Sequence, residues 1–257
     1  MKIVVLVKQV PDTSTERTMD TATGVLDRAA SDAVTSEIDE RALALALRLR
    51  EEHGGDITVL TMGPERATDA LRRCLAAGAD AAVHVLDPRL AGSDAFQTAT
   101  TLAAALRTVD FDLVVSGCES TDGKMGVVPA MIAELLRLPQ ASFLRSLEVT
   151  DGSVLGERVE GGTVVAMRAA LPCLVSVTEE VAEPKHPNLK GIMAAKKKPL
   201  TTIGLDELGI DGAGLAHART TVLDVAARPP RSGGHVIHDE GAAGAAIADF
   251  LAGARLI

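Results

Sequence analysis

The sequence predicts an α/β fold with a mostly parallel, doubly wound, Rossmann-like sheet of the nucleotide-binding type, added antiparallel strands and a C-terminal extension. Short β-branched runs alternate with longer helical segments in the first half of the chain, which is typical of a parallel sheet. Asp-Gly and Gly-Gly pairs, which favour hairpin turns, separate the strands that follow residue 140. The last part of the chain has short elements and too little apolar mass to fold alone.

The expected strands of the parallel sheet are short apolar runs rich in Val, as in strands buried on both faces. These runs are residues 2–7, 57–62, 81–86 and 111–117. Parallel strands need right-handed crossovers, so we expect helices on both faces. Ligands of such sheets bind beyond the carboxyl ends of the strands, where the strand order reverses.

Helical spacing of apolar residues predicts three helices, at 63–80, 93–110 and 125–138, and Gly78 is expected to end the first. Residues 41–52 carry Leu at every second position, which is a strand pattern. Their Ala, Leu, Arg and Glu content favours a helix, and the segment is long for a strand, so we interpret it as a helix. Ser36 and Asp39 before it resemble a capping box.

The hairpin signals within residues 145–179 predict antiparallel strands that join the main sheet. We therefore expect residues 1–200 to form a nucleotide-binding α/β domain that includes the segment 183–199. Residues 201–257 are expected to form a C-terminal extension, with a final helix, that packs on the main domain or on a partner chain.

Composition excludes several classes of function. The net charge of −9 and an aromatic content of 2%, without Trp or Tyr, argue against nucleic acid as the main partner. The absence of a long apolar run or signal peptide predicts a soluble, cytoplasmic protein without direct membrane insertion. Cys74, Cys118 and Cys173 lie far apart, and the histidines have no ligand spacing, so we expect reduced thiols and no metal site.

The loop 117–129 is the strongest candidate for a binding site. Gly117, Gly123 and Gly126 permit backbone conformations that other residues avoid, and a helix follows. The unpaired N–H groups at the start of a helix bind anions such as phosphate. The loop is neither a Walker A nor a GxGxxG motif, so a nucleotide site and a simple tight turn both explain it.

A catalytic constellation is not expected. Asp12, Asp39 and Asp122 are interpreted as turn and cap carboxylates, and Ser120 has no His nearby in sequence. Cys118 is either a reactive thiol or a small residue beside a ligand, and the second is favoured. A nucleotide pocket without a nucleophile or base indicates a carrier or a regulator rather than an enzyme.

The segment 183–199 places Leu189, Ile192 and Met193 among lysines, and no periodic pattern buries these three apolar residues. An exposed apolar patch commonly marks a protein-binding site. The lysine run 196–198 is expected to be a solvated face.

Several blocks of sequence resemble the β subunit of electron transfer flavoproteins. These are "KIVVLVKQVPDT" (2–13), "GPERATDALRRCLAAGADAAVHV" (63–85), "STDGKMGVVPAMIAELL" (120–136), "EPKHPNLKGIMAAKKKP" (183–199) and "PPRSGG" (229–234). The resemblance implies a heterodimer with an α subunit that mainly holds FAD. It also implies electron transfer from acyl-CoA dehydrogenases to a membrane quinone oxidoreductase, and a structural AMP bound by β.

The resemblance also implies roles for individual residues. The residues expected at the AMP are Leu6, Ser36, Met62, Gly117, Asp122, Gly123, Gly126, Val127 and Val128, with the phosphate on backbone N–H groups of the loop. Those nearest the flavin are Thr13 and Ile38. Relatives commonly have an aromatic residue at one or both of these positions, and this chain has neither. Leu189 is implied to dock into a pocket on the dehydrogenase, with Ile192 and Met193 behind it.

Three alternatives stay open. Electron-bifurcating relatives bind a second FAD where AMP sits. A stand-alone nucleotide sensor would be a monomer without flavin. An adenylyl-transfer enzyme would need a glycine-rich phosphate loop after the first strand, and "KQVPDTST" lacks one.

Overall fold

The computed structural model describes residues 1–226, 229–230, 233–234 and 236–257 of the chain. These residues divide into two compact units, Met1–Asp224 and Val225–Ile257. The first unit contains the sheets and the helices α1 to α5, and the second contains α6. None of the helices in the described ranges combines the length and the apolar character that a membrane span requires.

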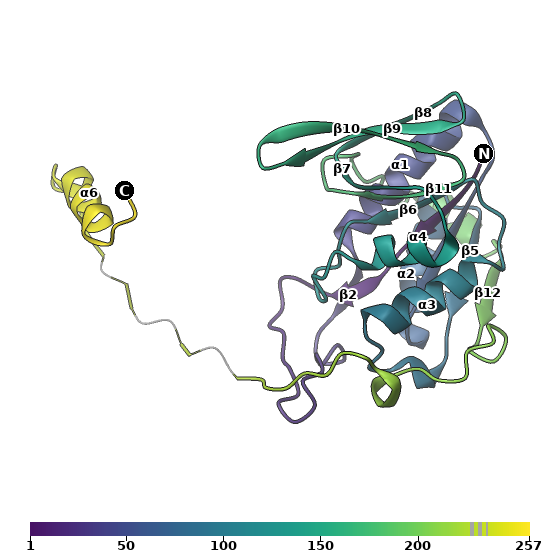
Figure 1. The fold of residues 1–257 in the computed structure, drawn as a ribbon, viewed down its shortest axis with the longest axis horizontal. Helices are drawn as coiled ribbons and strands as arrows, with labels where there is room; N and C mark the ends of the chain where they lie inside the picture. Colours follow the sequence, from purple (N-terminus) through teal and green to yellow (C-terminus); the bar gives the residue numbers. More distant parts are fainter. Residues whose placement is uncertain (227–228, 231–232, 235) are drawn as a thin grey trace. The chain divides into compact units, whose positions relative to one another are not determined.

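A seven-stranded sheet forms the centre of the first unit (Figure 1), and all of its strands are parallel. In spatial order the strands are β12 Leu200–Ile203, β5 Ala81–Val85, β4 Asp56–Met62, β1 Lys2–Leu6, β6 Leu113–Gly117, β11 Cys173–Val177 and β7 Gln140–Leu144. The apolar runs that predicted strands form β1, β4, β5 and β6, each within two residues of the expected ends.

Helices cover both faces of this sheet, as a doubly wound fold requires. They are α1 Glu37–His53 and α2 Thr68–Ala77 on one face, and α3 Ala95–Leu106 and α4 Val128–Leu136 on the other. Gly78 ends α2 with φ 142°, as predicted. Short 3-10 turns occur at Glu65–Ala67, Pro88–Leu90 and Leu215–His217.

The helical interpretation of residues 41–52 is confirmed, and the structure explains their period-two leucines. Leu43, Leu45, Leu47 and Leu49 are all buried in α1. The helix lies on the sheet and is also covered at its sides. On one side Leu47 lies close to Gly78 at the end of α2, where a Cβ would lie 2.7 Å from it. On another side the Arg48 guanidinium donates to the backbone oxygen of Leu147. Leucines on several sides of the helix are therefore buried.

The expected hairpins exist, but their strands do not join the main sheet. They form a separate antiparallel sheet of β8 Ser146–Thr150, β9 Ser153–Glu160 and β10 Thr163–Ala170. Its two turns are the Asp-Gly pair at 151–152 and the Gly-Gly pair at 161–162, all four residues with positive φ. A further antiparallel pair, which the sequence analysis missed, joins β2 Gln9–Pro11 to β3 Ala33–Thr35.

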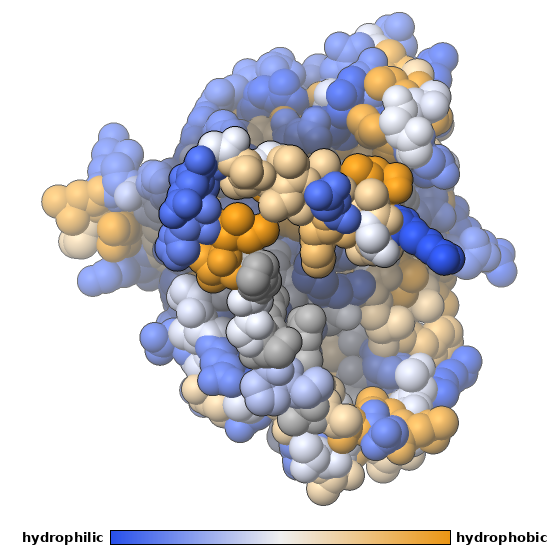
Figure 2. All heavy atoms as spheres, turned by 90° about the vertical axis from the view of Figure 1, so that its left-hand side faces the viewer, coloured by the Kyte–Doolittle hydropathy of each residue, from blue (hydrophilic) through white to orange (hydrophobic). Residues whose placement is uncertain are grey.

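The first unit extends past residue 200, where the sequence analysis divided the chain. β12 pairs with β5, so the segment after the lysine run completes the main sheet. The expected final helix is α6, Ala243–Gly253, which has no buried residue in the structure. Its apolar side chains are drawn in orange and tan in Figure 2. Part of the "PPRSGG" segment, residues 231–232, lies outside the described residues.

Candidate functional site

The strand order reverses between β1 and β6. The chain passes from β1 to β4 and β5 on one side, and then crosses to β6 on the other side of β1. Leu6 at the end of β1 pairs with Leu60 and with Ser116, so the carboxyl ends of three strands lie next to each other. A crevice at this edge is where a doubly wound sheet binds its ligand.

A buried carboxylate, Asp39, holds the two strands that flank this switch point. Its Oδ2 accepts a 2.9 Å hydrogen bond from the N–H of Lys8, and its Oδ1 accepts a 3.0 Å bond from the N–H of Gly117. The predicted capping box with Ser36 is therefore wrong, because the carboxylate is committed to the neighbouring strand ends. Burial raises the pKa of Asp39 to about 7, although both backbone donors favour the ionised form.

Gly117 is needed where α1 meets β6. A Cβ at this position would lie 2.4 Å from Asp39 Oδ1 and 3.0 Å from Ile38 Cγ2. The half-buried Ile38 therefore lies directly against the end of β6. Thr13, the other residue that the resemblance assigns to the flavin, is exposed in the turn after β2.

A second carboxylate, Asp122, organises the glycine loop. Its side chain is fully buried and receives Lys8 Nζ at 2.7 Å and Arg28 Nε at 2.8 Å. Desolvation opposes ionisation, but these two cations dominate and hold the pKa of Asp122 well below its usual range. Asp122 also accepts the N–H of Gly123 at 2.8 Å, so that N–H is already occupied. These contacts hold the glycine loop against Lys8 and Arg28.

The start of α4 presents N–H groups that have no acceptor. Within the described part of the chain, the backbone N–H groups of Gly126, Val127 and Val128 make no hydrogen bond. Pro129 follows them at the start of the helix. Gly126 adopts φ 64°, a left-handed conformation that favours glycine. Three open donors at the positive end of a helix are typical of an anion site.

Buried hydroxyls without partners gather at the same edge of the sheet. Among the described residues, those of Ser36, Thr61, Ser116 and Thr121 have no well-formed hydrogen bond. Leaving such a group unsatisfied costs about 1–3 kcal/mol, so a polar ligand at this edge would stabilise the protein. The sequence analysis named Ser36 but missed Thr61 and Ser116. Their signal was a polar residue near the carboxyl end of an otherwise apolar strand.

The structure brings part of the predicted nucleotide set together. Leu6 and Met62, at the carboxyl ends of β1 and β4, and Val128, at the start of α4, all contact the apolar cluster on the α3/α4 side. Ser36 lies at the start of α1, which covers the other face, and its N–H donates to the Lys8 oxygen at 2.9 Å. These four residues therefore lie on both faces of the sheet.

The segment 183–199 contains a helix that the sequence analysis did not expect. α5, Leu189–Ala195, is capped by the Asn188 side chain, which accepts the Gly191 N–H at 2.8 Å. A Cβ at Gly191 would lie 2.3 Å from the Ala76 oxygen, so glycine permits α5 to pack on α2.

The three apolar residues of this segment point away from the core. Leu189 is 77% exposed, Ile192 46% and Met193 59%, whereas Ala195 on the same helix is buried. An apolar surface on an anchored helix can bind another protein.

The lysine run is not entirely solvated, and the prediction for Lys198 is wrong. Its Nζ donates to the backbone oxygens of Leu75 at 3.0 Å and Ala79 at 2.6 Å, near the end of α2. A cation there interacts favourably with the negative end of the helix dipole. Lys198 therefore anchors the segment that follows α5.

The cysteines lie in the protein interior and are not paired with each other. Burial raises the pKa of Cys74 to about 12 and that of Cys173 to about 11. Burial, with a smaller contribution from Glu119, also raises the pKa of Cys118. The thiolate of Cys118 is therefore disfavoured, which argues against the reactive-thiol alternative.

Comparison with known proteins gives consistent results. A family model described as the electron transfer flavoprotein domain matches residues 23–208. The chain is 48% identical to the electron transfer flavoprotein subunit β of Mycobacterium leprae and 47% identical to that of Mycobacterium tuberculosis strain H37Rv, over 99% of both chains in each case. It is 33% identical to the caffeyl-CoA reductase-Etf complex subunit CarD of Acetobacterium woodii, over 92% of both chains.

Proposed function

The chain belongs to the electron transfer flavoprotein family, among the β subunits, and from this premise we propose that it is one half of a heterodimeric electron carrier. Its partner is an α subunit that mainly holds FAD. The complex takes electrons from acyl-CoA-type dehydrogenases and delivers them to a quinone oxidoreductase. The β chain performs no covalent catalysis. It binds a nucleotide, supports the flavin site and docks the dehydrogenase.

AMP is the nucleotide proposed for the switch-point crevice. The N–H groups of Gly126, Val127 and Val128 would hold its phosphate, and Asp122 keeps the preceding loop in place. The hydroxyls of Ser36 and Ser116 make no well-formed hydrogen bond within the described residues and would satisfy polar atoms of the nucleotide. The residues present therefore fit a mononucleotide, whose role here is structural.

FAD, when bound, accepts and donates electrons one at a time. The contribution of this chain is one wall of the flavin site, for which Thr13 and Ile38 are proposed. Ile38 is held against Gly117 by the start of α1, so its position depends on the same contact that anchors Asp39.

Docking of the dehydrogenase is proposed to occur on α5, through Leu189 with Ile192 and Met193 behind it. The single observation that carries this proposal is the 77% exposure of Leu189 on a helix whose opposite side is fixed to α2. A small apolar anchor favours brief contact, which suits a carrier that must dock, deliver and leave.

The C-terminal extension is proposed to pack on the α subunit. α6 exposes Ile247 and Phe250, and burial against a partner would remove this apolar surface from water. We also propose a cytoplasmic location, which is supported by three unpaired cysteines.

Two alternatives differ in measurable ways. A second FAD in place of AMP would give two flavins for each α/β pair. A stand-alone nucleotide sensor would give a colourless monomer. Co-expression with candidate α subunits, followed by purification, an absorption spectrum and analysis of released nucleotides, distinguishes the three. We expect a yellow heterodimer with one FAD and one AMP, and a flavin-free monomer with every α subunit would refute the proposal.

The docking role is tested in that heterodimer. Leu189→Ala should slow electron uptake from an acyl-CoA dehydrogenase while the flavin content stays unchanged. Loss of flavin in this variant would mean that α5 has a structural role instead.

A further inference from the structure

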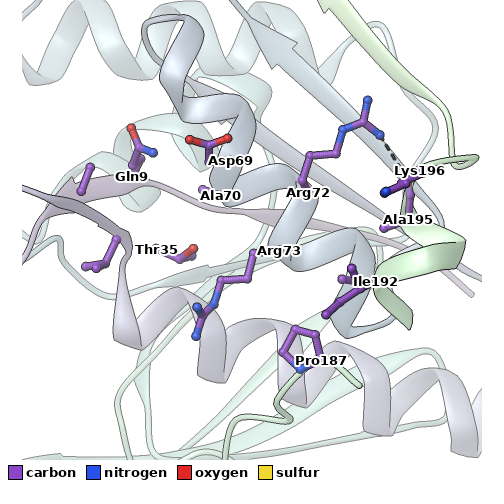
Figure 3. A pocket seen from close by; sticks show the side chains of 13 residues that line it. Gln9, Thr35, Asp69, Ala70, Arg72, Arg73, Pro187, Ile192, Ala195 and Lys196 are labelled. Carbon is purple, nitrogen blue, oxygen red and sulfur yellow. Dashed lines mark hydrogen bonds between the residues drawn. The ribbon is translucent and has the colours of Figure 1, made fainter. Parts of the chain in front are cut away.

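A pocket of about 660 Å³ lies beside α5, between α2 and the β2–β3 pair (Figure 3). None of the residues assigned to AMP or FAD lines it. Ile192 belongs both to its wall and to the exposed surface of α5. Its volume is in the range of about 300–1,000 Å³ that is usual for binding pockets.

Two cationic side chains lie together at one end of this pocket. Arg72 Nη1 donates at 3.1 Å to the oxygen of Ala195, the residue before Lys196 (Figure 3). None of the ion pairs within the described ranges, which join atoms at 4.0 Å or less, involves Arg72 or Lys196. Arg73 differs, because it pairs with Glu40 at 2.6 Å. Two cations without carboxylate partners favour an anionic group at this end.

The pocket also contains an unsatisfied buried hydroxyl. Thr35 is 6% exposed, and its Oγ1 has no hydrogen-bond partner in the described part of the chain. Gln9, on the neighbouring strand, is satisfied, because its Nε2 donates to the Arg66 oxygen at 2.9 Å. A polar atom of an occupant would complete the hydrogen bonding of Thr35.

The rest of the wall decides the polarity of the occupant. Pro187, Ile192 and Ala195 make the α5 side apolar, and Asp69 lies at the end away from Arg72 and Lys196 (Figure 3). Asp69 repels an anion, so the negative group of an occupant is directed to the two cations. An apolar group of the occupant, next to its negative group, would cover Ile192.

We propose that this pocket receives a carboxylate side chain, together with an adjacent apolar residue, from the dehydrogenase that docks on α5. The occupant is a protein segment because Ile192 joins the pocket to the docking surface, so a partner that covers α5 also covers the pocket. Charge complementarity identifies it as acidic. The inference rests on the proposed docking function and adds a chemical requirement for the partner surface.

A charged contact at the edge of an interface acts mainly on encounter and orientation. Such contacts are screened by salt, because the Debye length is only about 8 Å at physiological ionic strength. The pocket should therefore affect KM for the complex and the dependence of KM on salt. It should not affect kcat, which is the rate once the two proteins have docked.

The test uses the purified α/β complex, an acyl-CoA dehydrogenase that reduces it, and an acyl-CoA substrate. Initial rates of flavin reduction at increasing concentrations of the complex give KM and kcat. Lys196→Gln and Thr35→Val should each raise KM about three- to tenfold with kcat unchanged. In Lys196→Gln, KM should also depend less on salt. Lys197→Gln is the matched control, since Lys197 is exposed but does not line the pocket, and we expect a change below about twofold.

The outcomes separate this inference from the docking proposal. If Leu189→Ala raises KM but Lys196→Gln and Thr35→Val behave like Lys197→Gln, the pocket inference alone is refuted. If Leu189→Ala has no effect, docking on α5 is refuted and the pocket inference with it. Loss of the α subunit or flavin from Lys196→Gln would place the pocket in the subunit interface. A difference in sedimentation mass between the wild type and Lys196→Gln would indicate that a second copy of the chain occupies the pocket. Either result overturns the inference.

Discussion

The Oδ1 atom of Asp39 accepts a 3.0 Å hydrogen bond from the backbone N–H of Gly117, 78 residues away in the sequence. The other carboxylate oxygen accepts the N–H of Lys8 at 2.9 Å. One buried side chain thus joins the carboxyl ends of the two strands between which the sheet reverses. The crevice proposed for the nucleotide depends on this bridge, and so does the position of Ile38.

Asp39→Asn should change how stability depends on pH. Burial raises the pKa of Asp39 to about 7, whereas an unfolded Asp titrates near 3.9. The folded state therefore binds more protons between these values, and the contribution of Asp39 to the free energy of unfolding falls as pH rises through this window. The melting temperature of the complex between pH 4 and 8 should decrease with pH more in the wild type than in Asp39→Asn.

At the low-pH end of this range, where Asp39 is protonated, this variant should also be less stable than the wild type. The amide keeps one acceptor oxygen but presents an NH2 group to the second backbone donor, which costs about 1–3 kcal/mol. Parallel pH profiles for the two proteins would contradict the raised pKa, and an unchanged melting temperature would contradict the bridge.

Gly126→Ala should release the nucleotide. Gly126 has φ 64°, which disfavours alanine, and a Cβ there would lie 3.2 Å from Cζ of Phe143. The turn should shift and misplace the N–H groups of Val127 and Val128. We expect AMP content per complex, measured after acid release, to fall well below one. Gly161→Ala is the matched control. Gly161 lies in a hairpin turn and also has a positive φ, 56°, but a Cβ there would have no neighbour within 4 Å. Equal AMP loss in both variants would show that the turn at Gly126 does not determine AMP binding.

Gly191→Ala should move the docking helix. A Cβ at Gly191 would lie 2.3 Å from the Ala76 oxygen, so α5 must separate from α2. Electron uptake from the dehydrogenase should show a higher KM, while FAD and AMP contents remain unchanged. Ala194→Ser, which alters an exposed position of the same helix, should behave like the wild type. Wild-type kinetics in Gly191→Ala would show that the contact with α2 does not determine docking.

Lys198→Met should lower stability without affecting docking directly. The substitution removes the bonds from Nζ to the Leu75 and Ala79 oxygens, and we expect a loss of about 1 kcal/mol in the free energy of unfolding. Lys197→Met, one residue earlier and exposed, should change stability by less than about 0.5 kcal/mol. Chemical denaturation of the full chain measures both values, and similar losses would contradict the capping role.

Local pattern predicted most of the secondary structure, because burial on a sheet face or a helix face leaves a periodic signal. The β-branched runs became β1, β4, β5 and β6, and the Asp-Gly and Gly-Gly pairs became the hairpin turns. α5 was missed because a seven-residue helix held by a side-chain cap and one contact with α2 has too few turns to show a period.

The amino-acid sequence alone determined the elements of the sheet, the glycine loop before α4 and the three apolar residues that the core does not bury. It also carried the family resemblance that the comparisons confirm. Only the tertiary structure decided that Asp39 bridges two strands, that Lys198 caps α2 and that Thr35 faces a pocket with Arg72 and Lys196. These contacts join residues far apart in the chain, and a side chain's partner across such a distance is set by packing, which no local pattern records.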